Sequence, residues 1–393
     1  MILQLYIHFP FCKRKCFYCD FVSGPENDET IALYCFALQK EIRLMGEKYA
    51  GARVSTVFLG GGTPSIVPMR EMEKVLGALR ASFDFLPDAE FTTEANPGTL
   101  EAEWLETAMR YGLNRLSLGT QAAQDGLLRA IGRIHTFAQT RSAVSLARSC
   151  GIKNLNLDLM FGLPGQTLEA YRESVDAAAA LAPEHISAYS LILEEGTPLQ
   201  AMAAQGKVSL PGEDETAEMY EQGAQWLKAA GYERYEISNF ARPCYACRHN
   251  IGYWQGAWYL GLGAAAHSML PPDADEAAGG AVRVRRANTN DLRRYIAAMQ
   301  ADGEAVEERT PICAREAMFE TMMLGLRMTE GVSERAFLKT HGISLAARYG
   351  TPLERLVNEG LGQWLGGAPG NRRFALTARG LEMQNEALLR LME

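Results

Sequence analysis

Short apolar runs alternate with longer amphipathic stretches in the first half of the chain, and this alternation limits the possible folds more than any other feature. The runs are rich in residues that favour β-strands, and they recur roughly every 30 residues, about the length of one βα unit. The stretches between them have helical spacing of apolar residues. The pattern predicts an α/β fold, with a parallel sheet arranged as an incomplete barrel or doubly wound. The predicted strands are residues 3–9, 55–59, 89–94, 115–120, 154–161 and 185–193, and the helices 31–49, 69–83, 101–111, 137–150 and 168–181.

Length and charge define the setting. The 393 residues suffice for a barrel of about 200 to 250 residues and a smaller second domain. We expect a core at 1–200, an extension at 201–310, and a C-terminal helical, winged-helix-like domain at 311–393 with "PGN" at its hairpin tip. The net charge is −8 and the basic residues are scattered, so no nucleic-acid partner is expected. The sequence shows no secretory signal and no long apolar segment, which predicts a cytoplasmic protein.

Polar residues stand at the ends of several predicted strands. Glu94 ends "FTTE", Gln121 follows "LSLGT", and Asp158 alternates with leucines in "LNLDLM". In βα barrels the carboxyl ends of the strands converge on one site, so these three side chains are candidates for a ligand-binding ring. The alternative is that each one caps the helix that follows.

A run of three glycines, residues 60–62 in "FLGGGTPS", ends the second predicted strand. Without Cβ atoms, this turn would let backbone amides approach a ligand closely. The run lacks both GxGxxG and the Lys-Ser/Thr pair of a P-loop, so the usual nucleotide motifs are not present.

Three cysteines, Cys12, Cys16 and Cys19, lie in "FCKRKCFYCDF" after the first predicted strand. They match a cubic four-iron four-sulfur cluster in which one iron has no protein ligand. A small molecule with an amino and a carboxylate group can chelate that iron and accept an electron from the cluster. The alternatives are zinc with Asp20 or His8 as a fourth ligand, and inert buried thiols.

The CxxxCxxC spacing resembles that of the radical S-adenosylmethionine superfamily. The stretches "YIHFPFCKRKCFYCDF", "FLGGGTPS", "TTEANPGTL", "NRLSLGTQ" and "DLMFGLPGQT" resemble its oxygen-independent coproporphyrinogen III oxidase group. This resemblance implies an incomplete (β/α)6 TIM-like barrel with a 4Fe-4S cluster on the three cysteines and S-adenosylmethionine beside it. The residues it implies for S-adenosylmethionine are Tyr6, Gly61, Gly62 and Thr63 at the methionine portion, and Glu94, Gln121, Arg133 and Asp158 along the rest.

Two branches of that group differ at positions where this sequence is informative. The oxidases carry a further cysteine two places after the third and a longer N-terminal segment, whereas this chain has Phe21 and a short N-terminus. Both features resemble the heme chaperone branch, which also shows the HNxxYW found here in "CRHNIGYW", residues 247–254. The resemblance implies that His249 helps to bind heme as an axial ligand. The alternative is a histidine hydrogen bonded within its loop, with Cys247 as a second candidate ligand.

Two functions follow from the resemblance. The first is a heme chaperone that binds heme as cargo and passes it to an acceptor apoprotein, which could be membrane-associated, with an electron donor for the cluster. The second is oxygen-independent coproporphyrinogen III oxidase, which decarboxylates propionate side chains by radical chemistry. Phe21 and HNxxYW favour the first and argue against oxidase activity, while a radical reaction on another substrate stays open. No residue is predicted to be catalytic, and His267 in "GAAAHS" either faces a cofactor or packs.

Overall fold

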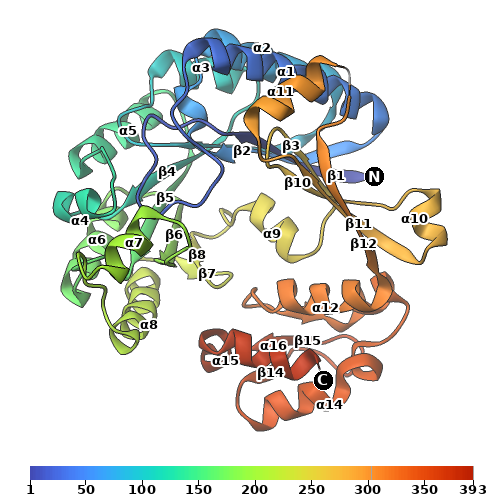
Figure 1. Ribbon diagram of the computed structural model, residues 1–393. Helices are drawn as coiled ribbons and strands as arrows, with labels where there is room; N and C mark the ends of the chain where they lie inside the picture. Colours follow the sequence, from blue (N-terminus) through green and yellow to red (C-terminus); the bar gives the residue numbers. More distant parts are fainter. Residues whose placement is uncertain (302, 393) are drawn as a thin grey trace.

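One curved sheet of twelve strands dominates the computed structural model, which describes residues 1–301 and 303–392 (Figure 1). The strand order is β12-β11-β10-β9-β1-β2-β3-β4-β5-β6-β8-β7, and β1 to β6 are parallel. The sheet stays open, because β12 and β7 form its two edges. The predicted parallel sheet is therefore confirmed as an incomplete barrel. Its parallel strands are β1 (Ile2–Phe9), β2 (Arg53–Gly61), β3 (Asp84–Ala95), β4 (Arg115–Gln121), β5 (Asn154–Phe161) and β6 (His185–Ser190).

Crossover helices cover the convex side of this sheet (Figure 1). Asn27, Thr136 and Thr167 cap three of these helices by accepting a backbone N–H bond in the first turn. All five predicted helices are present, with ends that differ by at most three residues from the predicted ones. They are α1 (Asp28–Lys48), α2 (Met69–Ser82), α3 (Ala102–Arg110), α5 (Phe137–Ser149) and α6 (Leu168–Ala180), with the shorter η1 (Pro64–Ile66) and α4 (Asp125–Ala130) inserted between them.

Side chains alternate between the two faces of the parallel strands. In β5, Leu155, Leu157 and Leu159 are fully buried in the core beneath the helices. The polar Asn156 and Asp158 therefore face the concave side of the sheet. The alternation in the sequence thus separates an apolar layer beneath the helices from a polar face on the concave side of the sheet.

The remaining strands extend the sheet at both edges. On one side β9 runs parallel to β1, and β10, β11 and β12 follow in antiparallel order. On the other side β8 and β7 are antiparallel to β6. These strands are β7 (Glu233–Arg234), β8 (Asn239–Ala241), β9 (Tyr259–Leu262), β10 (His267–Leu270), β11 (Ala281–Asn288) and β12 (Val306–Cys313), and the helices of this part are α7 (Pro198–Ala204), α8 (Glu213–Ala229), α9 (Arg248–Trp254), α10 (Ala274–Ala278) and α11 (Leu292–Gln300).

The C-terminal part packs around its own core, which includes Phe337, Tyr349, Leu353 and Phe374. It combines helices with an antiparallel three-stranded sheet, in the order β13-β15-β14. This arrangement agrees with the predicted winged-helix-like pattern. The elements of the C-terminal part are α12 (Ala314–Gly325), β13 (Val332–Ser333), α13 (Glu334–His341), α14 (Leu345–Asn358), β14 (Gly362–Leu365), β15 (Arg373–Leu376), α15 (Ala378–Glu382) and α16 (Gln384–Met392).

Within the described residues, no helix is both long and apolar enough to span a membrane.

Candidate functional site

The loop between β1 and α1 carries the three cysteines and is fixed by backbone hydrogen bonds. The N–H of Cys12 donates to the carbonyl of Gly24 over 2.9 Å, and the N–H of Phe17 donates to the carbonyl of Ile131 over 3.0 Å. The second bond ties the loop to the segment after α4, far away in the sequence. The structure therefore holds the loop over the carboxyl ends of the parallel strands, where barrel sites form.

The thiols of this loop are half-buried and free of disulfides. Cys12 Sγ lies 3.5 Å from Thr63 Oγ1, and Arg133 Nη1 donates to Cys16 Sγ over 3.5 Å. Burial raises the pKa of Cys19, and the other two thiols raise it further. In the described part of the chain, no three His, Cys, Asp or Glu side chains are grouped to hold a single metal ion. A cluster requires a wider arrangement, because each thiolate binds a different iron.

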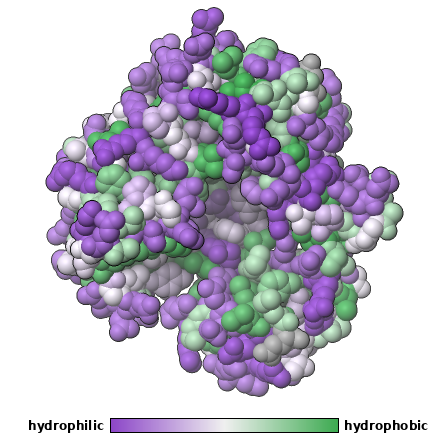
Figure 2. Space-filling model, in the orientation of Figure 1, coloured by the Kyte–Doolittle hydropathy of each residue, from purple (hydrophilic) through white to green (hydrophobic). Residues whose placement is uncertain are grey.

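A cavity of about 530 Å³ opens beneath the cysteine loop, and we call it the inner cavity. It lies within the arc of strands, where the space-filling view is hollowed (Figure 2). The three cysteines line it together with all but two of the other predicted site residues. Those that line it are Cys12, Cys16, Cys19, Gly61, Gly62, Thr63, Glu94, Gln121, Arg133 and Asp158.

Two carboxylates at the ends of β3 and β5 face the inner cavity. Glu94 Oε2 accepts the N–H of Gly61 over 3.2 Å, and Asp158 accepts from Asn156 over 2.7 Å and from Ser117 over 3.2 Å. Burial, with a further contribution from the charge of Asp158, raises the pKa of Glu94 to about 8. Burial also raises the pKa of Asp158 against the effect of these hydrogen bonds. Neither carboxylate caps a helix in this structure, so the ring interpretation is favoured over the capping one.

Arg133 is held at the centre of the site by partners that the sequence did not reveal. Its Nη2 donates to Asn96 Oδ1 over 2.6 Å and to the carbonyl of Gly119. Asn96 in turn donates to Thr63 Oγ1 over 2.7 Å. The Arg133 Nε atom is buried without a partner among the described residues. A buried, unpaired N–H of this kind fits a ligand oxygen, since leaving it unpaired has a cost.

Gln121 adopts a positive φ of 66° at the end of β4, a strained conformation for a residue other than glycine. Its Oε1 accepts from the hydroxyl of Tyr189 over 3.0 Å. Tyr189 lies near the end of β6 and lines the same cavity. Tyr189 was not predicted as a site residue, although it is a polar group near a strand end, which is the feature that identified Glu94.

The glycine turn lines the inner cavity, but its backbone amides are not free as predicted. Its amides are already used: the N–H of Gly61 donates to Glu94, and those of Gly62 and Thr63 donate to the carbonyls of Phe9 and Phe11 over 2.8 and 2.7 Å. The expectation that this turn offers free amides is therefore wrong, whereas the contact of Gly61, Gly62 and Thr63 with S-adenosylmethionine stays a prediction. The glycines provide space, because a Cβ at Gly62 would collide with the backbone of Phe11. Gly61 likewise has a φ of +102°, which glycine adopts without strain.

Tyr6 and His249 are the predicted residues that do not line the inner cavity. The Tyr6 hydroxyl is hydrogen bonded to His8 Nδ1 over 3.1 Å, and Tyr6 lines a neighbouring cavity. His249 is 1% exposed, and both ring nitrogens are occupied: Nδ1 by Thr56 Oγ1 at 2.7 Å and Nε2 by the hydroxyl of Tyr253 at 3.0 Å. In this conformation His249 is not available as an axial heme ligand, because no nitrogen lone pair faces a cavity. The alternative of a hydrogen-bonded histidine matches the structure.

Cys247, the second candidate heme ligand, is also buried. Its thiol donates to Glu90 Oε1 over 3.4 Å, and burial raises its pKa to about 12. A thiol held protonated in this way is a poor iron ligand, since the thiolate is the species that binds metals. Cys244 is exposed on the same segment.

Comparison with known proteins now defines the class. Residues 6–178 match the model of the Radical SAM superfamily, and residues 313–382 match the HemN C-terminal domain. Together with the barrel and the three cysteines, these matches define a radical SAM protein.

The chain is 37% identical over 360 residues to heme chaperone HemW from Bacillus subtilis, covering 91% of each protein. It is 36% identical over 348 residues to heme chaperone HemW from Escherichia coli, covering 87% of this chain and 86% of that one. The chain therefore belongs to the heme chaperone HemW family. The solved structure of coproporphyrinogen III oxidase HemN from Escherichia coli matches with a TM-score of 0.82 over 99% of this chain and 89% of that one. At 23% identity, that likeness shows a shared fold.

As a radical SAM protein the chain uses a 4Fe-4S cluster and S-adenosylmethionine, and the inner cavity fits both. The cysteine thiols would hold the cluster, whose open iron and low-potential electron are the chemistry it supplies when bound. The strand-end carboxylates would hold amino and hydroxyl groups of S-adenosylmethionine, while the unpaired Nε of Arg133 would hold an oxygen.

Proposed function

We propose that this protein is a heme chaperone that binds heme and transfers it to an acceptor protein, with its cluster and S-adenosylmethionine in the inner cavity. The observation that carries this proposal is the match to heme chaperone HemW from Bacillus subtilis over 91% of both chains. Similarity over this length includes the barrel, the HNxxYW segment and the C-terminal part. The aligned length is therefore greater than a shared radical SAM core alone would give.

Phe21 supports the chaperone over the oxidase. It occupies the place where the oxidases are expected to carry a further cysteine, and its side chain is 60% exposed. It lines the inner cavity next to the cluster loop. A phenyl ring can neither bind iron nor donate a proton, so this position does not supply the chemical group present in the oxidases.

The surface around the cysteine loop supports an electron donor as a partner. Lys13, Arg14 and Lys15 are exposed on this loop, although the whole chain has a net charge of −8. A local positive patch attracts a partner with an acidic surface and raises its association rate. We propose that a reductant of this kind docks here.

The acceptor protein follows from the chaperone function, because bound heme must be released to a protein that uses it.

The test compares the two functions in one preparation. The anaerobically purified, cluster-loaded chain is titrated with hemin, then mixed with an apo heme protein, and separately incubated with coproporphyrinogen III, S-adenosylmethionine and a reductant. We expect stoichiometric hemin binding, transfer to the apoprotein, and no decarboxylation. Absence of hemin binding, or robust decarboxylation, would overturn the proposal.

A further inference from the structure

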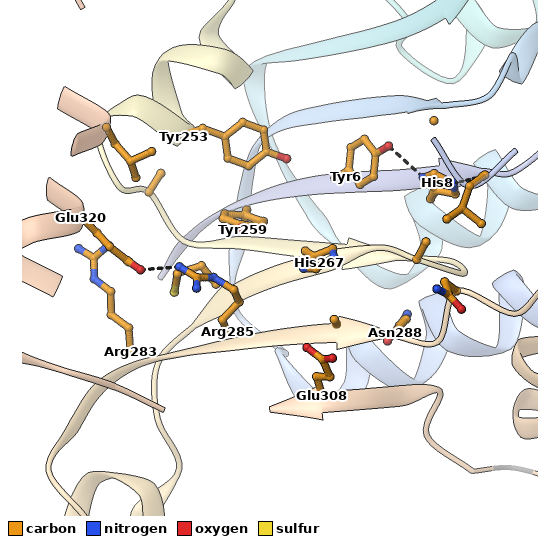
Figure 3. Close-up of a pocket in the computed structure, with 18 of the residues that line it drawn as sticks. Tyr6, His8, Tyr253, Tyr259, His267, Arg283, Arg285, Asn288, Glu308 and Glu320 are labelled. Atoms are coloured by element: carbon orange, nitrogen blue, oxygen red, sulfur yellow. Dashed lines mark hydrogen bonds and ion pairs between the residues drawn. The ribbon is translucent and has the colours of Figure 1, made fainter. Parts of the chain in front are cut away.

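A second cavity of about 710 Å³ lies beside the inner cavity, between the outer strands of the sheet and helix α12, and we call it the outer cavity (Figure 3). The two cavities share Asp20, Phe21 and Gly61, so part of the cysteine loop lines both. The volume of the outer cavity falls in the range of about 300–1,000 Å³ that is typical of small-molecule and cofactor sites. The cluster and S-adenosylmethionine do not account for its far wall.

That far wall is one face of the antiparallel strands. His267 and Met269 lie two residues apart on β10, and Arg283 and Arg285 lie two apart on β11, so each pair points to one side of its strand. The register places Met269 opposite both Arg285 and Tyr259. All five side chains line the outer cavity, and Arg283 also lines a neighbouring cavity together with Trp258. Figure 3 shows His267 on the strand side of the cavity, below Tyr6 and Tyr259.

His267 differs from the other five histidines of the chain. Its side chain is exposed to the cavity, and its ring forms no hydrogen bond to any described residue. The other rings are all hydrogen bonded, to backbone or side-chain groups. They are His8, His135, His185, His249 and His341. A histidine with a free ring nitrogen in a cavity can bind iron as a neutral imidazole.

Two arginines at the same wall suit a ligand with two carboxylates. Arg283 forms no hydrogen bond or ion pair within the described residues, and its guanidinium lies over the Trp258 ring, 5.3 Å from the centroid. Burial lowers the pKa of Arg283, and a bound anion would offset that cost. Arg285 Nη2 donates to Glu320 Oε1 on α12. The guanidinium has further N–H groups, so it can bind a carboxylate while it keeps this bond.

The other walls are mainly aromatic and apolar, as a flat porphyrin ring requires. Tyr253 and Trp254 from α9 line one side, and Met323 and Leu324 from α12 line another. Asp20, Glu307, Glu308 and Glu320 also line the cavity, and Glu307 is paired with Arg294. The charge of Glu320 acts on Arg283, but no carboxylate forms an ion pair with Arg283 within the described residues, so an anionic group is expected to bind there. The apolar walls and the two guanidinium groups thus point to an apolar ring that carries carboxylates.

We propose that the outer cavity is the heme site, in which a ring nitrogen of His267 binds the iron and Arg283 and Arg285 bind the two propionate carboxylates. This inference rests on the proposed function and assigns it to residues outside the cluster site. It replaces His249 and Cys247, both buried and hydrogen bonded, as the source of the axial ligand.

The test titrates hemin and iron-free protoporphyrin IX into the cluster-loaded full chain. We expect His267→Ala and His267→Gln to weaken hemin binding about tenfold or more and to shift the Soret band, while protoporphyrin IX binding stays unchanged, since the porphyrin lacks iron. The double variant Arg283→Ala/Arg285→Ala should weaken binding of both ligands about tenfold or more. Arg309→Ala is the matched control, because Arg309 on β12 does not line the cavity and pairs with Asp273 and Glu276 at the start of α10.

The outcomes separate the inference from the proposed function. If the wild-type chain binds no hemin, the proposed function fails. The wild-type chain can instead bind hemin while both His267 variants, with normal cluster content, show the same affinity and Soret position. That result would overturn the assignment of the outer cavity, and the chaperone function would stand. If Arg309→Ala and the double variant lose hemin affinity equally, the role of Arg283 and Arg285 is overturned.

Discussion

Replacement of His249 by alanine tests whether this residue supports the fold rather than binding iron. The ring is buried and joins Thr56 on β2 to Tyr253 on α9. The variant loses two hydrogen bonds, worth about 1 kcal/mol each net. It also leaves a cavity where the imidazole was, which adds about 1 kcal/mol. We therefore expect His249→Ala to lower the free energy of unfolding by about 3 kcal/mol at pH 7.

The same loss should depend on pH. Burial lowers the pKa of His249 from 6.5 to about 3 in the folded chain. Below pH 6.5 the unfolded chain takes up a proton that the folded chain takes up only near pH 3, so the stabilisation is complete above pH 6.5 and is lost as the pH falls. The loss is about 1.4 kcal/mol per pH unit, or about 2 kcal/mol at pH 5. The alanine variant lacks this titration. The difference in the free energy of unfolding between the wild-type chain and the variant should therefore shrink to about 1 kcal/mol at pH 5.

Urea unfolding of the cluster-free chain, followed by tryptophan fluorescence at pH 7 and pH 5, measures both values. Leu157→Ala is the control, because Leu157 is fully buried in the same sheet and has no titrating group. Its deficit should be the same at both pH values. A His249→Ala deficit that is equally independent of pH, or below about 1 kcal/mol at pH 7, would refute the reasoning.

Three further predictions concern the inner cavity. Cys12→Ser should abolish the brown cluster chromophore, whereas Cys35→Ser, on the buried face of α1, should keep it; visible absorption after anaerobic reconstitution decides. Glu94→Gln and Asp158→Asn should each weaken S-adenosylmethionine binding in calorimetry, about tenfold or more, with iron content unchanged, and unaltered affinity in both would contradict the site. Gly62→Ala should lose cluster and fold together, because its Cβ would meet backbone rather than a movable side chain; normal circular dichroism and iron content would contradict this.

The parallel sheet was predictable because its signals are local. Each strand of β1 to β6 contains apolar residues, which in β5 alternate with polar ones, and each predicted helix repeats apolar residues at helical spacing. The carboxyl ends of parallel strands meet at one edge, so Glu94, Gln121 and Asp158 could be placed together without knowing any contact. The short strands β8, β9 and β10 have three or four residues and little pattern. Their place in the sheet depends on contacts with distant segments, which the sequence does not display.

The site residues that the sequence missed have the same explanation. Asn96 reads as a turn residue before a proline, yet it connects Arg133 to Thr63. The glycine turn suggested free amides, but the carbonyls of Phe9 and Phe11 that accept two of them come from another strand and loop. The role of His249 rests on Thr56, which lies 193 residues earlier in the chain.

The HNxxYW segment can affect heme binding without supplying an iron ligand. Glu90 on β3 accepts the N–H groups of Arg248 and His249 over 2.9 and 3.0 Å, which fixes the start of α9 inside the arc of strands. His249 then holds the hydroxyl of Tyr253, whose ring lines the outer cavity. Variants of His249 and His267 should therefore give different hemin-binding signatures. His249→Ala loosens one wall and should lower hemin affinity while the Soret band of the bound fraction keeps its position, whereas the His267 variants should move that band, because axial-ligand identity sets the electronic state of the iron.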